Sequence, residues 1–241
     1  AIDEVLNGPS YKAAVEGRFE KKNNTISVAR VLDVEGGVDY HTGNIIFPGD
    51  VIITGEIKDG FKVYAGGSVI CKDTLDASDV VSKQDLVVSA GIIGKNKGLL
   101  RVGGSIEAKY IENCRVKARG DLNISDAIVN SHIKTTGNVN MGERGTIVGG
   151  DISAIQGIRA FRVGKEAGPC TALQCGIDFI AQKKLDQVKK KHTALYLKLQ
   201  TVEKLLKKED KQELKLVKEK ITKALSRLSS HMSKLLESIH K

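Results

Sequence analysis

Pairs of glycines are the first residues in this chain whose type and spacing suggest chemistry, because glycine-rich loops can bind phosphate groups. The pairs are Gly36-Gly37, Gly66-Gly67, Gly103-Gly104 and Gly149-Gly150. A phosphate loop needs a helix directly after its glycines, so that the helix N-terminus faces the phosphate. The residues that follow, such as Ser68-Val69, instead begin short alternating runs typical of strands. We therefore interpret the pairs as corners that need positive φ.

The four cysteines do not predict a metal or redox site. Cys170 and Cys175 have four residues between them, and no histidine or second cysteine pair lies nearby to complete a tetrahedral zinc site. Cys71 and Cys114 alternate with apolar residues, so we expect them to be small buried hydrophobic residues. Four cysteines in a chain of 241 residues also give no disulfide framework.

Two histidines lie in informative segments. His41 belongs to the polar run 39–45, where turn chemistry explains it better than catalysis, since no Gly-x-Ser-x-Gly elbow supports a nucleophile. His192 falls on the apolar seam of a predicted helix, where a polar residue can set the register of helix pairing. The acidic residues form no acid–base pair. The sequence therefore predicts no catalytic residue, no metal ligand, no cofactor-binding residue and no cofactor, and we expect a protein that is not an enzyme.

A repeated three-residue motif, called the phrase below, predicts how the glycines, cysteines and histidines above are positioned. It consists of a small or polar residue, usually Gly, then Asp, Asn or Ser, then an aliphatic residue. The seven copies are Gly49-Asp50-Val51, Gly67-Ser68-Val69, Gln84-Asp85-Leu86, Gly104-Ser105-Ile106, Gly120-Asp121-Leu122, Gly137-Asn138-Val139 and Gly150-Asp151-Ile152. Their first residues lie 18, 17, 20, 16, 17 and 13 residues apart. Such a short period is typical of a solenoid with one copy in each coil, a rod with flat faces and no obvious pocket.

Each repeat contains three apolar segments with a period of two, as expected for strands with one buried face. Val51 and Ile53 illustrate the segment after the phrase, and Val116 and Ala118 the segment before the next one. The segment between these two is represented in successive repeats by one aliphatic residue each: Ile57, Leu75, Ile93, Ile111 and Ile128. The irregular spacing does not fit the strict six-residue period of a left-handed hexapeptide helix, and parallel crossovers favour the right hand. The array therefore predicts a right-handed parallel β-helix.

The segments around the array complete a mainly β chain with an α tail. Residues 1–35 are predicted to form short strands at 11–17 and 25–31 that cap the first coil. The β-helix is assigned to residues 36–176 and a C-terminal helical coiled coil to residues 177–241.

Apolar residues in the tail recur at alternating steps of three and four, a heptad pattern. One seam runs from Leu185 to Leu206 and a second from Leu214 to Ile239. The charged stretch between them breaks the heptad, which favours two antiparallel helices in a coiled-coil hairpin. The alternative is one continuous helix that dimerises, since no Gly or Pro marks the turn.

Charge and hydropathy narrow the class of protein. No apolar run is long enough to span a bilayer, the first residues lack a signal-peptide pattern, and cysteines are few, so we expect a soluble, cytoplasmic protein. The formal net charge is +9, and residues 181–241 hold 17 Lys and Arg against 7 Asp and Glu. The lysine clusters of this tail, Lys183-Lys184, Lys189-Lys190-Lys191 and Lys207-Lys208, have little Arg near them and no aromatic residues interleaved with the lysines. This favours a solvated coiled-coil face over binding to nucleic acid or another acidic partner.

Several segments together resemble the flagellar assembly protein A (FapA) family of bacteria. They are Val34-Glu35-Gly36-Gly37-Val38-Asp39-Tyr40-His41-Thr42-Gly43-Asn44-Ile45, the turns at Gly49-Asp50-Val51 and Gly66-Gly67-Ser68-Val69, and Lys109-Tyr110-Ile111-Glu112-Asn113-Cys114-Arg115-Val116 before Gly120-Asp121-Leu122. The resemblance covers roughly residues 10–240. It implies a non-enzymatic cytoplasmic protein with a β-helix and a coiled-coil tail, linked to flagellar assembly or placement.

The leading interpretation is a scaffold or adaptor that binds flagellar or pole-associated protein partners, with homo-oligomers forming through the coiled coil or a β-helix end. The first alternative is a bactofilin-like element that polymerises end to end into filaments. The second is a nonspecific binder of acidic partners or nucleic acid through the basic tail, whose affinity would fall steeply with salt. An acyltransferase on a β-helix would need hexapeptide periodicity and a catalytic histidine, and neither is present.

Overall fold

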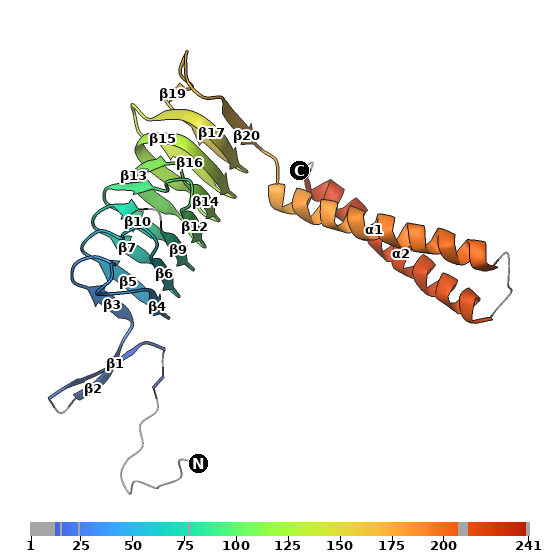
Figure 1. Ribbon diagram of the computed structural model, residues 1–241, viewed down its shortest axis with the longest axis horizontal. Helices are drawn as coiled ribbons and strands as arrows, with labels where there is room; N and C mark the ends of the chain where they lie inside the picture. Colours follow the sequence, from blue (N-terminus) through green and yellow to red (C-terminus); the bar gives the residue numbers. More distant parts are fainter. Residues whose placement is uncertain (1–12, 15, 24, 77, 207–211, 240–241) are drawn as a thin grey trace, which may run out of the picture. The chain divides into compact units, whose positions relative to one another are not determined.

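The computed structural model describes residues 13–14, 16–23, 25–76, 78–206 and 212–239. It divides into two compact units, Ala1–Gln174 and Cys175–Lys241 (Figure 1). The first unit is a parallel β-solenoid preceded by a hairpin, and the second is a pair of helices.

The hairpin pairs β1 (Arg18–Lys22) with β2 (Thr25–Ala29) in antiparallel register, and Asn23, with φ of 53°, lies at its turn. The second predicted strand, 25–31, is therefore confirmed in most of its length. The first lies at 18–22 and not at 11–17, because Lys22 pairs with Thr25 and the register carries the pairing back to Arg18. Residues 11, 12 and 15 lie outside the described residues.

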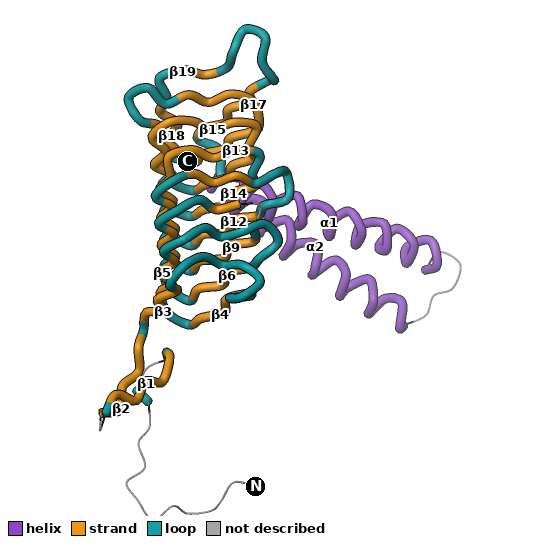
Figure 2. Tube along the Cα trace, turned by 60° about the vertical axis from the view of Figure 1, so that its left-hand side comes forward, coloured by secondary structure: helices purple, strands orange, loops and turns teal. Residues whose placement is uncertain are grey.

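Three stacks of parallel strands form the faces of the solenoid (Figure 2). The first face contains β3 (Val31–Val34), β5 (Asp50–Ile53), β7 (Val69–Cys71), β10 (Leu86–Val88), the starts of β13 (Ile106–Glu112) and β15 (Leu122–Thr135), β16 (Asn138–Met141) and β18 (Gly157–Arg159). The second begins with bridges at Val38 and Ile57 and continues through β8 (Leu75–Asp76), β11 (Gly91–Ile93), β13, β15, β17 (Thr146–Ala154) and β19 (Arg162–Val163). The third contains β4 (Ile45–Phe47), β6 (Lys62–Ala65), β9 (Asp79–Ser82), β12 (Leu99–Val102), β14 (Arg115–Ala118), the ends of β15 and β17, and β20 (Thr171–Cys175).

The core is a set of aliphatic columns that run along the solenoid inside these faces. Val51, Val69, Leu86, Ile106 and Leu122 stack in one column, and each is fully buried. Side chains of the same size and shape recur about every 4.8 Å, so each coil fills the surface left by the previous one. The predicted parallel β-helix is confirmed, while the hand of the coil stays a prediction.

The predicted repeat is misassigned at two places. The middle position of the fourth coil is Ile92 and not Ile93, because Ile92 pairs with Leu75 and Ile111 and is buried. Both residues are isoleucine, so the pattern could not distinguish them.

The seventh phrase, 150–152, is not a first-face turn either. Its Ile152 pairs with Ile133 on the third face, whereas the first face continues at Ile158, the partner of Val139. The short spacing of 13 residues reflects this change of face.

The repeated phrase forms a polar ladder, which we define as Asp50, Ser68, Asp85, Ser105, Asp121 and Asn138. Each aspartate uses its Oδ1 to accept the backbone N–H of the next member at 2.7 Å, in the following coil. Each serine Oγ accepts the next backbone N–H at 3.2–3.4 Å. These bonds satisfy amides at the corner, where the sheet ladder is interrupted.

The glycines at these corners are needed for a different reason from the one predicted. Gly36, Gly149 and Gly150 have positive φ as expected, but the pairs 66–67 and 103–104 do not. A Cβ on Gly67 or on Gly104 would overlap the ladder carboxylate of the coil below, Asp50 or Asp85. The Gly of the phrase therefore leaves room for the carboxylate that the preceding coil places at this corner.

The second unit consists of α1 (Phe179–Leu206) and α2 (Gln212–Ile239). Asp178 caps α1, since its Oδ1 accepts the backbone N–H groups of Ile180 and Ala181, each at 2.9 Å. Two contacts fix the direction of pairing: Glu203 binds Lys218 at 2.8 Å, and His192 Nε2 lies 3.3 Å from Ser229 Oγ. An earlier residue of α1 meets a later residue of α2, so the helices are antiparallel and the single-helix alternative is wrong. His192 lies on the seam as predicted.

Replacing Asp121 with Ala should destabilise the solenoid by about 1–3 kcal/mol, because the backbone N–H of Asn138 loses its acceptor at a partly buried corner. The measurement is urea unfolding followed by circular dichroism. Asp126→Ala is the control, because Asp126 is exposed and accepts no ladder amide. Equal midpoints for the two variants would contradict the role of the ladder.

Candidate functional site

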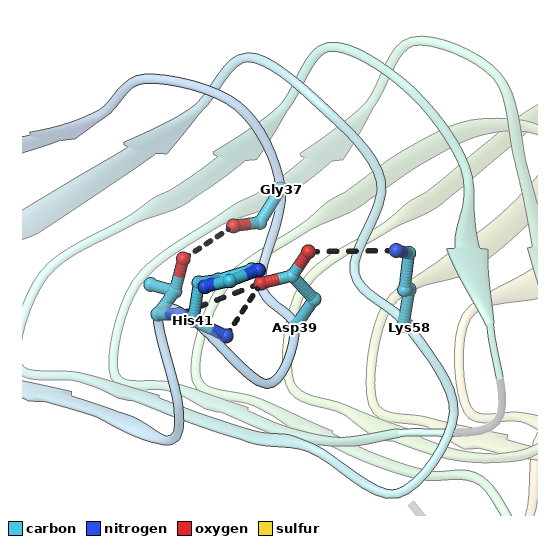
Figure 3. A network of polar contacts seen from close by, with 5 residues as sticks. Gly37, Asp39, His41 and Lys58 are labelled. Carbon is cyan, nitrogen blue, oxygen red and sulfur yellow. Dashed lines mark hydrogen bonds and ion pairs between the residues drawn. The ribbon is translucent and has the colours of Figure 1, made fainter.

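A loop in the first coil is organised around the carboxylate of Asp39 (Figure 3). Its Oδ1 accepts the backbone N–H groups of His41, at 2.9 Å, and Thr42, at 3.4 Å. The Thr42 hydroxyl donates to the Gly37 carbonyl at 2.8 Å, which closes the loop on itself. An aspartate that accepts amides two and three residues later is a standard turn-forming arrangement, so the sequence dictates this geometry locally. The prediction of a turn around His41 is confirmed.

Electrostatics hold the loop against the next coil. Lys58, in the second coil, lies with its Nζ 3.4 Å from Asp39 Oδ2. The His41 amide is the largest influence on the Asp39 carboxyl and lowers its pKa below the ordinary value of 3.8, with Thr42 and Lys58 acting in the same direction against a smaller effect of burial. The ionised carboxylate is therefore the form that fits this loop.

The loop presents an aromatic side chain to solvent. Tyr40 is 94% exposed. Its ring contacts that of Phe61 in an edge-to-face arrangement, with the two ring centroids 5.3 Å apart. On the third face, Ile46 is 82% exposed and pairs in register with Tyr64 of the next coil. We name as the first-coil surface the group formed by Tyr40 and Ile46 of the first coil with Phe61 and Tyr64 of the second, which adjoin them.

Large exposed hydrophobic residues are not spread evenly over the first unit. They are Phe19, Ile26, Val31, Tyr40, Ile46, Tyr64, Phe161, Val163 and Leu173. Between Tyr64 and Phe161 the described residues expose none. Clusters of exposed apolar side chains, unlike single ones, often mark surfaces that other molecules cover, so the two ends of the array are the candidate interfaces.

Sequence reasoning did not single out the first-coil surface. The detectable signal was Ile46, an apolar residue at an outward position of a strand whose pattern is otherwise alternating. The exposure of Tyr40 depends on how the Asp39 turn projects it, and residue spacing does not encode that direction.

The residues that could do chemistry are not brought together. Cys71 and Cys114 are buried, as expected, and burial raises both thiol pKa values, that of Cys114 to about 12. Cys170 and Cys175 are exposed. Throughout the part of the chain that the structure describes, no three His, Cys, Asp or Glu side chains are grouped to hold a metal ion. In the same residues, the His41 ring makes no hydrogen bond to a Ser or Thr hydroxyl.

An open groove of about 570 Å³ follows the corner after the first face. Its lining includes Glu107, Lys109, Asn123, Asn140 and Met141. The amide of Asn140 donates to Asn123 Oδ1 at 3.2 Å, so these two side chains are partners of each other. The lining contains one carboxylate, Glu107, and no histidine or cysteine, so it carries no argument for catalysis.

The chain matches the family model described as the Flagellar Assembly Protein A (FapA) beta solenoid domain over residues 30–241. The matched range contains all the solenoid coils and both helices. Comparisons with curated proteins and with solved structures find no match. None of the described helices is both long and apolar enough to cross a membrane.

Replacing Asp39 with Ala should loosen the Tyr40 loop, because the amides of His41 and Thr42 lose their acceptor. We expect faster hydrogen exchange at both amides by NMR. In the wild type the ordering should be complete above pH 3.8 and lost as pH falls through the lower folded-state pKa. Asp33→Ala, an exposed change in the first coil, should leave both amides unchanged. Unaltered exchange in Asp39→Ala would refute this account of the loop.

Proposed function

The chain belongs to the FapA family of β-solenoid proteins, and from this we propose that it acts as a non-enzymatic scaffold or adaptor in bacterial flagellar assembly or placement. Its proposed partners are flagellar or pole-associated proteins, and its proposed location is the cytoplasm. The domain organisation that we propose is a cap at 1–35, a β-helix at 36–176 and a helical coiled coil at 177–241.

The observation that carries the proposal is the first-coil surface. Tyr40 is exposed, yet its loop is held by three hydrogen bonds from within the first coil and an ion pair to the second. A rigid, exposed aromatic residue loses little conformational entropy when a partner covers it, which is why tyrosine is enriched at the centres of protein interfaces. Ile46 and Tyr64 supply apolar area on the adjoining face.

A second candidate, an end-to-end filament, is supported by the exposed apolar residues at the far end of the array. Phe161 is 67% exposed and Val163 49% exposed. In the pairings given by the described residues, β3 and β4 of the first coil and β18 and β19 of the last coil each pair on one side only, so these strands could offer parallel edges to a second copy. Negative-stain electron microscopy of the purified chain distinguishes the two candidates, because only the filament produces extended polymers.

The scaffold proposal predicts a motility defect that depends on the first-coil surface. In the source bacterium lacking its own copy, a chain carrying Tyr40→Ala and Ile46→Ser should restore swimming and flagellar number poorly compared with wild type. The control is Tyr196→Ala, which removes an exposed tyrosine from α1. Soft-agar swimming and flagella per cell are measured, with chain abundance checked by immunoblot.

Normal flagella in cells without the chain would overturn the proposed role. Full restoration by the double variant would retain the role but exclude the first-coil surface as the docking site.

A further inference from the structure

The third face of the solenoid carries an outward column that changes from apolar to cationic along the coils. The column runs in register through Ile46, Tyr64, Val81, Arg101, Lys117 and Lys134. Successive side chains in such a column stand about 4.8 Å apart. Its last three members are exposed, and none of the six is acidic.

A second outward column on the same strands adds to this charge. It passes through Leu99, Arg115 and His132, with Arg115 and His132 both exposed. In this column the partner of Leu99 in the preceding coil is Asp79, and the partner of His132 in the following coil is Asp151. We define Arg101, Arg115, Lys117 and Lys134 as the cationic ladder, which occupies adjacent coils without an interposed acid.

Stacking like charges at this distance is unfavourable, and several other lysines of the solenoid are paired with carboxylates. In the first coils Lys58 binds Asp39, Lys62 binds Asp79, and Lys95 binds Asp76 and Asp59. By contrast, Arg101, Arg115 and Lys117 form no ion pair with any described residue. Among the described residues, none supplies a paired counter-charge to Arg101, Arg115 or Lys117, so an anion from another molecule would relieve the repulsion between them.

The surroundings of the ladder indicate which anion fits. Val81 and Leu99 are half-buried and adjoin it on the same face, so an apolar surface continues directly from the cations. The charged strip is short, because Asp79 and Asp151 bound the second column at its two ends, and a planar anionic bilayer would meet these carboxylates as well. Tyr64 is separated from Arg101 by Val81, so the ring beside these cations is the imidazole of His132, and no Phe, Tyr or Trp side chain stands among them in either column to stack a nucleobase.

We propose that this face binds an extended acidic segment of a partner protein, with carboxylates on the cationic ladder and apolar side chains over Val81 and Leu99. Carboxylates form strong charge-assisted hydrogen bonds with arginine, which supplies two members of the ladder. The inference does not depend on the flagellar role, and the failure of either leaves the other intact.

The test is fluorescence anisotropy with the full chain. The probe is a fluorescein-labelled peptide of alternating Glu and Ser with two leucines at one end, and the blank is the same peptide with Gln for Glu. Binding of the Glu peptide should weaken with salt. The variant Arg101→Glu/Lys117→Glu should lower its affinity roughly tenfold or more, because two attractive contacts become repulsive.

The matched control is Lys72→Glu/Lys97→Glu, which reverses two exposed charges outside the third face and changes the net charge equally. It should bind like wild type. A photoreactive group on the peptide should cross-link to residues 81–134 and not to the basic tail. Circular dichroism checks that both variants fold. If the Arg101→Glu/Lys117→Glu variant does not fold, Arg101→Gln/Lys117→Gln is used in its place.

Four outcomes would overturn the proposal: no binding by wild type, equal loss in the variant and its control, no loss in either, or cross-links confined to the tail. Tighter, ladder-dependent binding of single-stranded oligonucleotides or of phosphatidylserine vesicles would also overturn it by identifying another class of partner.

Discussion

Register between coils is the constraint on which the rest of this structure depends. At one corner the polar ladder enforces it: the Asp50, Asp85 and Asp121 carboxylates each accept an amide from the following coil. The carboxylate occupies space where the next coil would carry a Cβ, so glycine must be there. Once the corner is aligned, inward aliphatic residues stack into closed columns. Neither the columns nor the ladder is stable alone, because each coil buries its apolar face only against its neighbours.

This construction explains why the surface and not a cavity is the place to look for function. Every outward residue of a strand also belongs to a column, so a run of similar residues becomes a continuous strip. The third face shows both results, with exposed Ile46 and Tyr64 in the first coils and the cationic ladder further along. Two chemically different surfaces can thus share a single flat face, as a scaffold with more than one partner would require.

Sequence alone predicted the parts that depend on periodicity. The inward positions around Val51, Val116 and Ile124 and the two helical seams follow directly from apolar spacing. It failed where two explanations share one signal. A Gly pair can mean positive φ or close packing, and only contacts between coils reveal that Gly67 faces Asp50. The phrase at 150–152 copies a first-face turn but lies on the third face. The exposure of Tyr40 arises from the geometry of the Asp39 turn, and the cationic ladder from pairing residues 16 or 17 positions apart, such as Lys117 with Lys134.

The most direct test of a surface-based function is in-cell photo-cross-linking. A photoreactive amino acid would replace Tyr40 in the source bacterium, and a second strain would carry it at Glu107, outside the first-coil surface. The account predicts cross-links from position 40 to flagellar or pole-associated proteins, identified by mass spectrometry, and few from position 107. Equal cross-linking at the two positions, or none to such proteins at position 40, would contradict it.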